Sequence, residues 1–188
     1  MHPIFKEYCS QTINCRTITR MTPYTIALML FHIGTPSAAA ETAPPSPGKW
    51  QIAPSAGEES LALSLKAEKP VKGWMKIFVP TLTIQCDKGK AALSIETGMG
   101  LEVTMVDQQI VHVQIDDNKP TTQRWREVTN TTVFATTRDA TALIKQFTQS
   151  QKFLFEFTPF NSAPAQAEFA VTGLSAYSLQ LNRTCWGK

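Results

Sequence analysis

The residues best suited to catalysis are few and widely separated in this sequence. His112 is the only histidine after residue 40, and it lies between Val111 and Val113 in a strand-like run. A zinc site with two histidine ligands is therefore excluded from that part of the chain. A Ser-His-Asp triad would have to use His112, and the Gly-x-Ser-x-Gly turn that presents the serine in α/β-hydrolases does not occur. We expect His112 to lie on a strand surface.

Carboxylates could provide acid–base catalysis. The run Asp116–Pro120 opens with two adjacent aspartates whose side chains diverge, and its composition is that of a turn. A glycosidase would need two separated carboxylates, for which Glu96, Glu102 and Glu127 are candidates, and the sequence singles out none of them. Phosphate-loop and dinucleotide motifs do not occur either. We expect neither a cofactor nor a metal site, and we expect that the protein is not an enzyme.

Two arginines form the most conspicuous candidate binding surface. In Arg124-Trp125-Arg126 the period of a strand places the arginines on one face and the tryptophan on the other. Paired guanidinium groups could clamp a carboxylate or a phosphate. The alternative is that Trp125 belongs to the core while the arginines are solvated and paired with Glu127 or with a neighbouring strand. The sequence favours this alternative.

An export signal is predicted at the start of the chain. The apolar run 24–33 is about ten residues long, which is too short to cross a bilayer but fits the hydrophobic region of a secretory signal. Arg16 and Arg20 precede it, and Ala38 and Ala40 provide the small residues for cleavage before Glu41. The alternative is a buried or anchoring helix. We expect residues 1–40 to be removed, and the protein to be periplasmic or secreted without a stable membrane anchor.

The boundaries near this signal carry two further expectations. Met21 is an alternative start of translation, in which case Cys9 and Cys15 are not part of the protein. Residues 41–49 are rich in proline and are expected to form a flexible leader. Residues 50–188 then make a single domain.

Export makes the two remaining cysteines, Cys86 and Cys185, a candidate disulfide pair. Cys86 ends the alternating run Thr81–Cys86, in which it shares a face with Leu82 and Ile84, so its sulfur should point toward the core. The alternative is a pair of buried free thiols.

Charge argues against nucleic-acid binding. The whole chain has a formal net charge of +3, but residues 41–188 hold 15 Lys+Arg and 14 Asp+Glu, a net charge of +1. Nucleic-acid binding requires a basic patch that displaces counterions, so we exclude this class of function.

Period-two patterns dominate the sequence after Trp50 and predict about eight antiparallel strands. Nine runs are the candidates for these strands: 61–65, 81–86, 91–97, 101–105, 110–115, 122–128, 131–136, 153–157 and 167–171. A turn at 98–100 is expected to join 101–105 to the preceding strand, and 101–105 should form a hairpin with 110–115.

Two segments follow the period of a helix instead. Ala140, Leu143, Ile144 and Phe147 form one stripe within 139–150, which Thr137 or Asp139 can cap. A shorter helix with Leu174, Tyr177 and Leu181 is expected to end before Cys185. The fold class is therefore mainly β, as an antiparallel β-sandwich-like domain with two short helices and one disulfide.

The order of these motifs resembles the VasI (TagO) family of type VI secretion system-associated proteins. The resemblance covers roughly residues 50–188 and rests on the strand ending in Cys86, on Arg124-Trp125-Arg126, on Ala167 to Leu174 and on Cys185-Trp186. It implies an exported accessory protein that acts in the cell envelope beside a contractile secretion machine. The matching positions are Cys86 and Cys185 as the bridge, with Trp125, Phe169, Gly173 and Leu174 as fold residues.

Two functions are compatible with these observations. The first is a non-enzymatic accessory of a type VI secretion system that binds a protein partner in the envelope. The second is a periplasmic inhibitor or immunity-type protein that inserts a loop, either Asp116–Pro120 or Phe157–Pro164, into a cell-wall hydrolase.

Overall fold

A computed structural model describes residues 46–54, 60–73, 75–102 and 107–187. This part lies within the unit Thr42–Lys188. The predicted export run 24–33, the cleavage position at Ala40 and both Cys9 and Cys15 lie outside the described residues.

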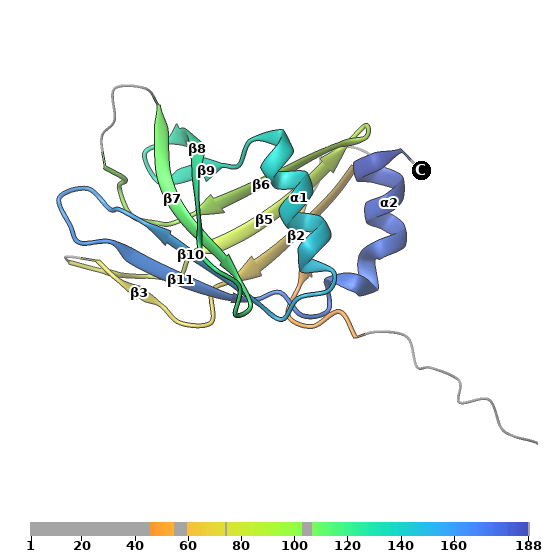
Figure 1. The fold of residues 1–188 in the computed structure, drawn as a ribbon, viewed down its shortest axis with the longest axis horizontal. Helices are drawn as coiled ribbons and strands as arrows, with labels where there is room; N and C mark the ends of the chain where they lie inside the picture. Colours follow the sequence, from red (N-terminus) through yellow and green to blue (C-terminus); the bar gives the residue numbers. More distant parts are fainter. Residues whose placement is uncertain (1–45, 55–59, 74, 103–106, 188) are drawn as a thin grey trace, which may run out of the picture. The chain divides into compact units, whose positions relative to one another are not determined.

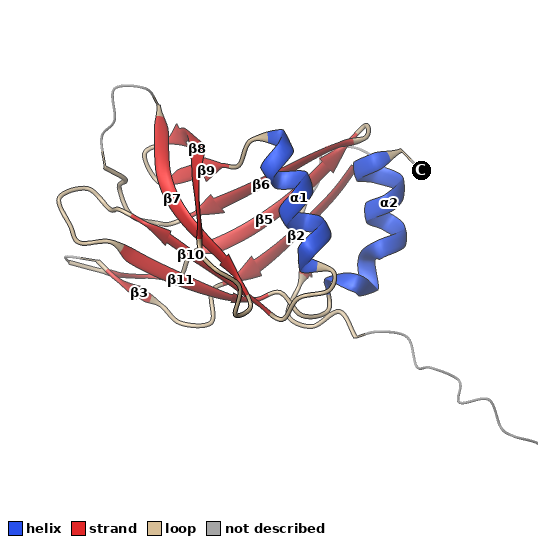
Figure 2. Cartoon of the chain, in the orientation of Figure 1, coloured by secondary structure: helices blue, strands red, loops and turns tan. Residues whose placement is uncertain are grey.

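The described chain is mostly antiparallel β-structure with two short α-helices, which confirms the predicted fold class (Figures 1 and 2). Nine strands form one sheet in the order β1-β2-β5-β6-β9-β8-β7-β10-β11, and β3 and β4 form a separate pair. The elements are β1 (Gln51–Ile52), β2 (Ser60–Lys66), β3 (Val71–Lys72), β4 (Ile77–Phe78), β5 (Thr81–Asp87), β6 (Lys90–Glu96), β7 (Gln108–Ile115), β8 (Thr121–Thr129), β9 (Thr132–Phe134), α1 (Thr137–Phe147), β10 (Lys152–Phe157), β11 (Ala165–Ala170), the 3₁₀ turn η1 (Leu174–Tyr177) and α2 (Ser178–Trp186).

The sandwich-like layering comes from one continuous sheet that curls on itself. Strands β2, β5 and β6 form the back of the domain in Figure 1, and β7, β10 and β11 lie in front of them. The far edge returns toward the start of the sheet, since the backbone N–H of Glu68, just after β2, donates to the carbonyl of Glu168 in β11 at 2.8 Å. The inner face of the sheet thereby becomes the core.

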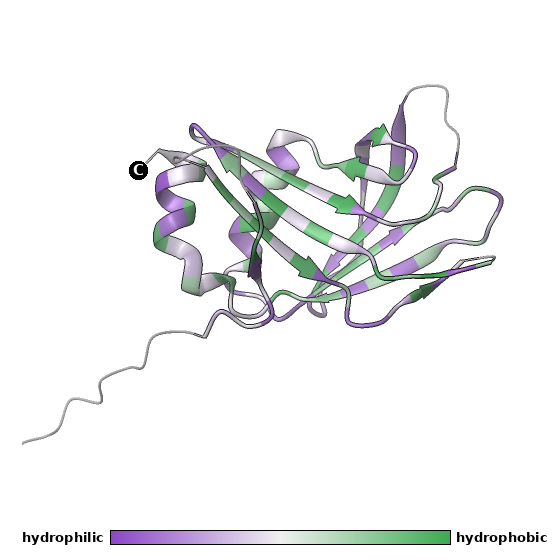
Figure 3. Ribbon diagram, turned by 180° about the vertical axis from the view of Figure 1, so that it is seen from behind, coloured by the Kyte–Doolittle hydropathy of each residue, from purple (hydrophilic) through white to green (hydrophobic). Residues whose placement is uncertain are grey.

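Side-chain alternation explains why these segments form strands. In β5, Leu82, Ile84 and Cys86 are buried while the residues between them are half-buried or exposed. Green and purple residues alternate along the strands in Figure 3 for the same reason. Because a strand turns successive side chains to opposite faces, this pattern keeps one face of each strand in the core and the other toward solvent.

Aromatic rings fill the core between the two halves of the sheet. Phe153 and Phe155 of β10 are fully buried, as are Trp125 of β8 and Phe147 of α1. Ring centroids lie 5.1 Å apart for Trp125 and Phe155, and 4.9 Å apart for Phe147 and Phe153. These tilted contacts join α1, β10 and β8 into one packed unit.

Both helices cover one end of the curled sheet, at the right of Figure 1. Helix α1 begins after Thr136, whose hydroxyl oxygen accepts the backbone N–H of Asp139 at 3.2 Å. The prediction that Thr137 or Asp139 caps this helix was therefore wrong: the cap is Thr136, one residue before Thr137. Thr136 has the extended backbone that an N-cap needs, and its hydroxyl also bonds the Asp139 carboxylate at 2.8 Å.

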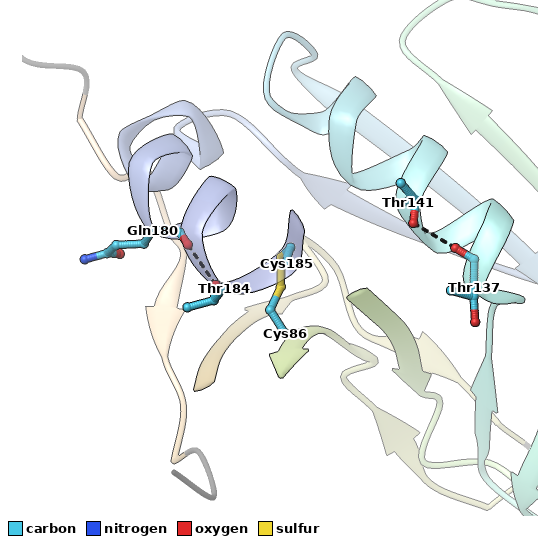
Figure 4. The surroundings of a disulfide bond; sticks show 6 residues. All are labelled: Cys86, Thr137, Thr141, Gln180, Thr184 and Cys185. Carbon is cyan, nitrogen blue, oxygen red and sulfur yellow. Dashed lines mark hydrogen bonds between the residues drawn. A yellow bond between two sulfur atoms is a disulfide. The ribbon is translucent and has the colours of Figure 1, made fainter. Parts of the chain in front are cut away.

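Helix α2 is tied to the end of β5 by the disulfide between Cys86 and Cys185, whose Cα atoms are 4.7 Å apart (Figure 4). The backbone N–H of Gly89 in the β5–β6 turn adds a bond to the carbonyl of Thr184 at 2.9 Å. The helix was expected to end before Cys185, but it continues to Trp186 and stops at Gly187, which has φ 62°. Glycine adopts this left-handed conformation at little cost.

The segment after the turn at residues 98–100 differs from the prediction. Leu101 forms an isolated antiparallel bridge with Pro159, in the connection after β10, rather than a hairpin with β7. The rest of the expected strand, residues 103–106, lies outside the described part of the chain. Strand β7 pairs instead with β8 and β10.

The packed domain begins slightly before Trp50. The indole N–H of Trp50 donates to the carbonyl of Val171 at 3.1 Å. Next to it, Gly48 lies directly on Thr172 and Gly173: a Cβ atom on Gly48 would be 2.2 Å from the Thr172 carbonyl oxygen. The last residues of the predicted leader 41–49 thus contact the domain.

Removing the disulfide tests how far it stabilises the domain. The bridge joins residues 99 positions apart, and in the chain-entropy account a loop of about 100 residues is worth up to about 4–5 kcal/mol. We expect the double variant Cys86→Ala/Cys185→Ala to lose about that much free energy of unfolding in urea titrations. The parent protein treated with a reductant should fall to the same stability. Equal stability of oxidised parent and double variant would contradict the assignment.

Candidate functional site

Trp125 fixes the orientation of strand β8. Its side chain is fully buried, and its indole N–H donates to Oε1 of Gln123 at 2.8 Å. Neighbouring side chains in a strand point to opposite faces, so Arg124 and Arg126 lie on the outer face, and both are exposed. The expectation that Trp125 belongs to the core is confirmed.

Neither guanidinium group forms an ion pair within the described residues. The expected partner Glu127 points to the other side of the strand, where its carboxylate accepts from Nε2 of Gln109 at 2.7 Å. Arg126 lies instead over the ring of Phe134 on β9, with Cζ 6.0 Å from the ring centroid. This distance allows a weak cation–π contact and leaves the N–H groups of the arginine available to a ligand.

Apolar side chains flank the two arginines on the same outer face. Ile110 lies opposite Arg124 in the register of β7 and β8, and Phe134 lies opposite Arg126 in the register of β8 and β9. Ile110 and Val128 are exposed large hydrophobic residues. We call Ile110, Arg124, Arg126, Val128 and Phe134 the arginine face. Arginine beside apolar side chains is a combination enriched at the centres of protein interfaces.

His112 lies on β7 beside the arginine face. It is on the surface of a strand, as predicted. Its side chain is exposed, and its Nδ1 is 3.0 Å from Oγ1 of Thr122. Glu156 of β10 lies opposite His112 in the register, but among the described residues no carboxylate is hydrogen-bonded to the imidazole. His112, Glu102 and Glu156 line one hollow of about 280 Å³. Nucleophilic catalysis uses a base that a hydrogen-bonded partner orients, and in the described part of the chain the partner of the imidazole is the Thr122 hydroxyl rather than either glutamate.

The three candidate carboxylates are not gathered into one site. Nε2 of Gln109 donates to the Glu127 carboxylate and, at 2.5 Å, to the backbone carbonyl of Glu102 rather than to its carboxylate. Glu96 is engaged elsewhere, by the backbone N–H of Gly98 at 3.0 Å and by the hydroxyl of Thr132. Gln109 is a buried polar residue that the sequence analysis missed. The alternation of β7 could have placed it on the inner face, with Val111.

A cavity of about 680 Å³ lies between the two helices and the β5–β6 turn. Lys145 is the only charged residue among its described lining residues, and its Nζ lies 5.6 Å from the ring centroid of Trp186. The other described lining residues are Gly89, Thr148, Gln149, Ser178, Leu181 and Asn182. Among these described residues, no carboxylate, histidine or thiol accompanies the lysine.

The turn after β7 is tied to β10. Oδ1 of Asp116 accepts the backbone N–H groups of Gln151 at 2.9 Å and Lys152 at 2.8 Å. These two bonds, that of Lys152 first, lower the pKa of Asp116 below its ordinary value. Of the two loops considered for insertion into an enzyme, the one that begins at Asp116 is thus held against the sheet.

Within residues 46–187, where they are described, no three acidic, histidine or cysteine side chains are grouped so that they could bind a metal ion. No described helix is both long enough and apolar enough to span a membrane. Comparison with protein-family models, curated proteins and solved structures found no match for this chain.

The bonds of Asp116 predict a specific acid sensitivity. A carboxylate whose pKa is lower in the folded state than in the unfolded chain stabilises the fold at pH values above its unfolded pKa of about 4, and this contribution is lost as the pH falls through the folded value. We expect Asp116→Asn, which keeps the acceptor oxygen and tolerates the left-handed backbone of this position (φ 49°), to lower the melting temperature at neutral pH and to leave it nearly unchanged at the lowest pH at which the parent is folded.

Asp117→Asn is the matched control, because Asp117 is exposed and its Oδ1 forms a loose ion pair with Nζ of Lys152 at 3.7 Å. It should change the melting temperature much less. A pH-independent effect of Asp116→Asn would show that its carboxylate does not act through charge.

Proposed function

We propose that the chain is an exported, non-enzymatic protein that binds a protein partner in the bacterial cell envelope through the arginine face. The observation that carries this proposal is the pair of exposed arginines that have no carboxylate partner in the described chain and are flanked by exposed apolar side chains. Such a face would match a partner with acidic and apolar residues. Guanidinium groups bind carboxylates in a bidentate manner, and apolar neighbours exclude water from the contact.

The envelope setting and the type VI secretion apparatus are the further parts of this proposal. They are supported by the signal-like start of the sequence and by the resemblance to the VasI (TagO) family, which the order of the motifs around Cys86, Trp125 and Cys185 carries. The buried disulfide is in keeping with an oxidising compartment.

Charge reversal on the arginine face tests the proposal. In cells that lack the gene, the parent protein should restore secretion by the contractile apparatus. Arg124→Glu/Arg126→Glu should restore it poorly, since two repulsive charges would then face the acidic partner. Both positions are exposed, so the melting temperature should change little.

Arg138→Glu/Arg183→Glu is the matched control, because it reverses two exposed arginines on the helices. This variant should restore secretion fully. Normal secretion in the deleted cells themselves would refute the secretion setting, and equal effects of the two double variants would refute the arginine face.

A second candidate function, inhibition of a cell-wall hydrolase, is favoured by one observation. In the loop from Phe157 to Pro164, Phe160 is exposed, while its backbone N–H is fixed to the carbonyl of Gly100 at 2.7 Å. An exposed aromatic side chain on a fixed backbone suits insertion into a cleft, because little conformational freedom is lost on binding.

This second function makes a separate prediction. Deleted cells would secrete normally and become sensitive to one cell-wall hydrolase, and the purified protein would inhibit that enzyme in a one-to-one complex. Phe160→Asp should then weaken inhibition by about a hundredfold, as expected for an anchoring side chain at the centre of an interface. Exposed Leu179 on α2 provides the control, and Leu179→Asp should inhibit normally.

A further inference from the structure

Exposed apolar side chains gather at the end of the domain opposite the helices. The β3–β4 hairpin and the loop after β10 both project toward the left of Figure 1. Met75 and Ile77 in the hairpin region are 78% and 69% exposed, and Phe160 in the loop is 63% exposed. We call Met75, Ile77 and Phe160 the apolar end. Met75 and Phe160 line the same groove of about 390 Å³.

The backbone beneath the apolar end is closely packed. Gly98 has φ 71°, and a Cβ atom there would lie 2.8 Å from the ring of Phe78, so the turn and the hairpin touch. The hydroxyl of Thr97, which is fully buried, bonds the carbonyl oxygens of Met99 and Thr131 at 2.8 and 2.9 Å. The exposed side chains are thus presented by a backbone that is already bonded and packed.

Lysines supply the charge around the apolar end. Lys72 lies opposite Ile77 in the β3–β4 register, and Lys76 is in the lining of the groove beside Met75. Lys69 precedes the hairpin and is exposed as well. The segments 97–101 and 157–164, which contribute the other side of this end, contain no charged residue.

The acidic residues that border this end do not neutralise the lysines. Glu68 is paired with Lys49 at 2.6 Å. Glu96 accepts from Gly98 and Thr132, and Glu102 is exposed at the edge of the described segment. Among the described residues no ion pair involves Lys69, Lys72 or Lys76.

We propose that the apolar end docks reversibly on a membrane surface that contains anionic lipid. Met75, Ile77 and Phe160 enter the boundary between headgroups and acyl chains, while Lys72 and Lys76 reach the lipid phosphates. Separate apolar side chains at projecting tips fit a fluid interface, and lysine stems let the charged heads remain at the headgroup level. Three side chains give weak, reversible attachment, and the lysines make it depend on lipid charge.

Co-sedimentation of the full chain with vesicles tests the docking. We expect binding to vesicles of phosphatidylcholine mixed with phosphatidylglycerol, and much weaker binding to phosphatidylcholine alone. Lys72→Gln/Lys76→Gln should lower the partition coefficient on the mixed vesicles by about fivefold for each lysine. Lys90→Gln/Lys119→Gln removes the same charge from two exposed positions elsewhere, the start of β6 and the β7–β8 connection, and should have little effect.

The apolar contribution has its own matched pair of variants. Met75→Ser/Phe160→Ser should lower partitioning by about tenfold or more, because buried CH₂ groups drive insertion. Ile52→Ser/Leu179→Ser replaces two side chains that are equally exposed, at 69% and 74%, on β1 and α2. It should bind like the parent. The apolar run 24–33 is present in every variant, so any binding through it adds equally to test and control variants.

A local probe identifies the part that enters the membrane. In the difference spectrum against the parent, Phe160→Trp should shift its emission to the blue on mixed vesicles and be quenched by brominated phospholipid. Leu179→Trp should show neither change.

Three results would overturn the proposal: equal losses in test and control variants, vesicle binding that does not depend on lipid charge, or an unshifted Phe160→Trp emission spectrum.

A dimer in solution that Met75→Ser/Phe160→Ser abolishes would assign the apolar end to a second copy of the chain instead. Loss of hydrolase inhibition in that variant with vesicle binding unchanged would assign it to a protein partner. Failure of vesicle binding leaves the arginine face untouched, since the two surfaces share no residue.

Discussion

The contact of Trp125 with Phe155 in the core decides which side chains the domain can present to a partner. The tryptophan is fully buried, and its ring lies 5.1 Å from that of Phe155. A slip of β8 by one residue would expose it and turn both neighbouring arginines into the core, where unpaired charge is costly. The packing of Trp125 in the core thus keeps Arg124 and Arg126 on the solvent-facing side of β8.

Regular elements were predictable where the side-chain period was strong. The alternation in β2, β5 and β10 and the helical stripe of α1 are each local signals, and the structure confirms them. The order of the strands was not predictable, because it depends on pairings between distant segments. Leu101 shows the difference: its neighbours suggested a hairpin with the next strand, whereas its bridge is to Pro159, 58 positions later along the chain. The predicted helix ends were wrong because single residues decide them: the Thr136 hydroxyl at the start of α1 and the backbone angle of Gly187 at the end of α2.

The arginine face and the apolar end also differed in how far the sequence could predict them. The arginine face follows from alternation about a single tryptophan, so its two charged members were named from the sequence. Its apolar members were not, because Phe134 joins Arg126 only through the pairing of β8 with β9. The apolar end is assembled from the hairpin around β3 and β4, the turn at 97–101 and the loop at 157–164. In the sequence, each of these segments resembles an ordinary connection, and only the curled sheet brings them to one end of the domain.

The position of the disulfide along the chain also sets an order of events during synthesis. Cys86 is made 99 residues before Cys185, and in that interval β6 to β11, α1 and most of α2 must appear. Until Cys185 has been made, the Cys86 thiol has no partner in the described domain, and α2 cannot cover its end of the sheet. The bridge therefore cannot form until α2 has been made, and a chain that stalls before α2 would leave the helical end of the sheet uncovered and the Cys86 thiol free.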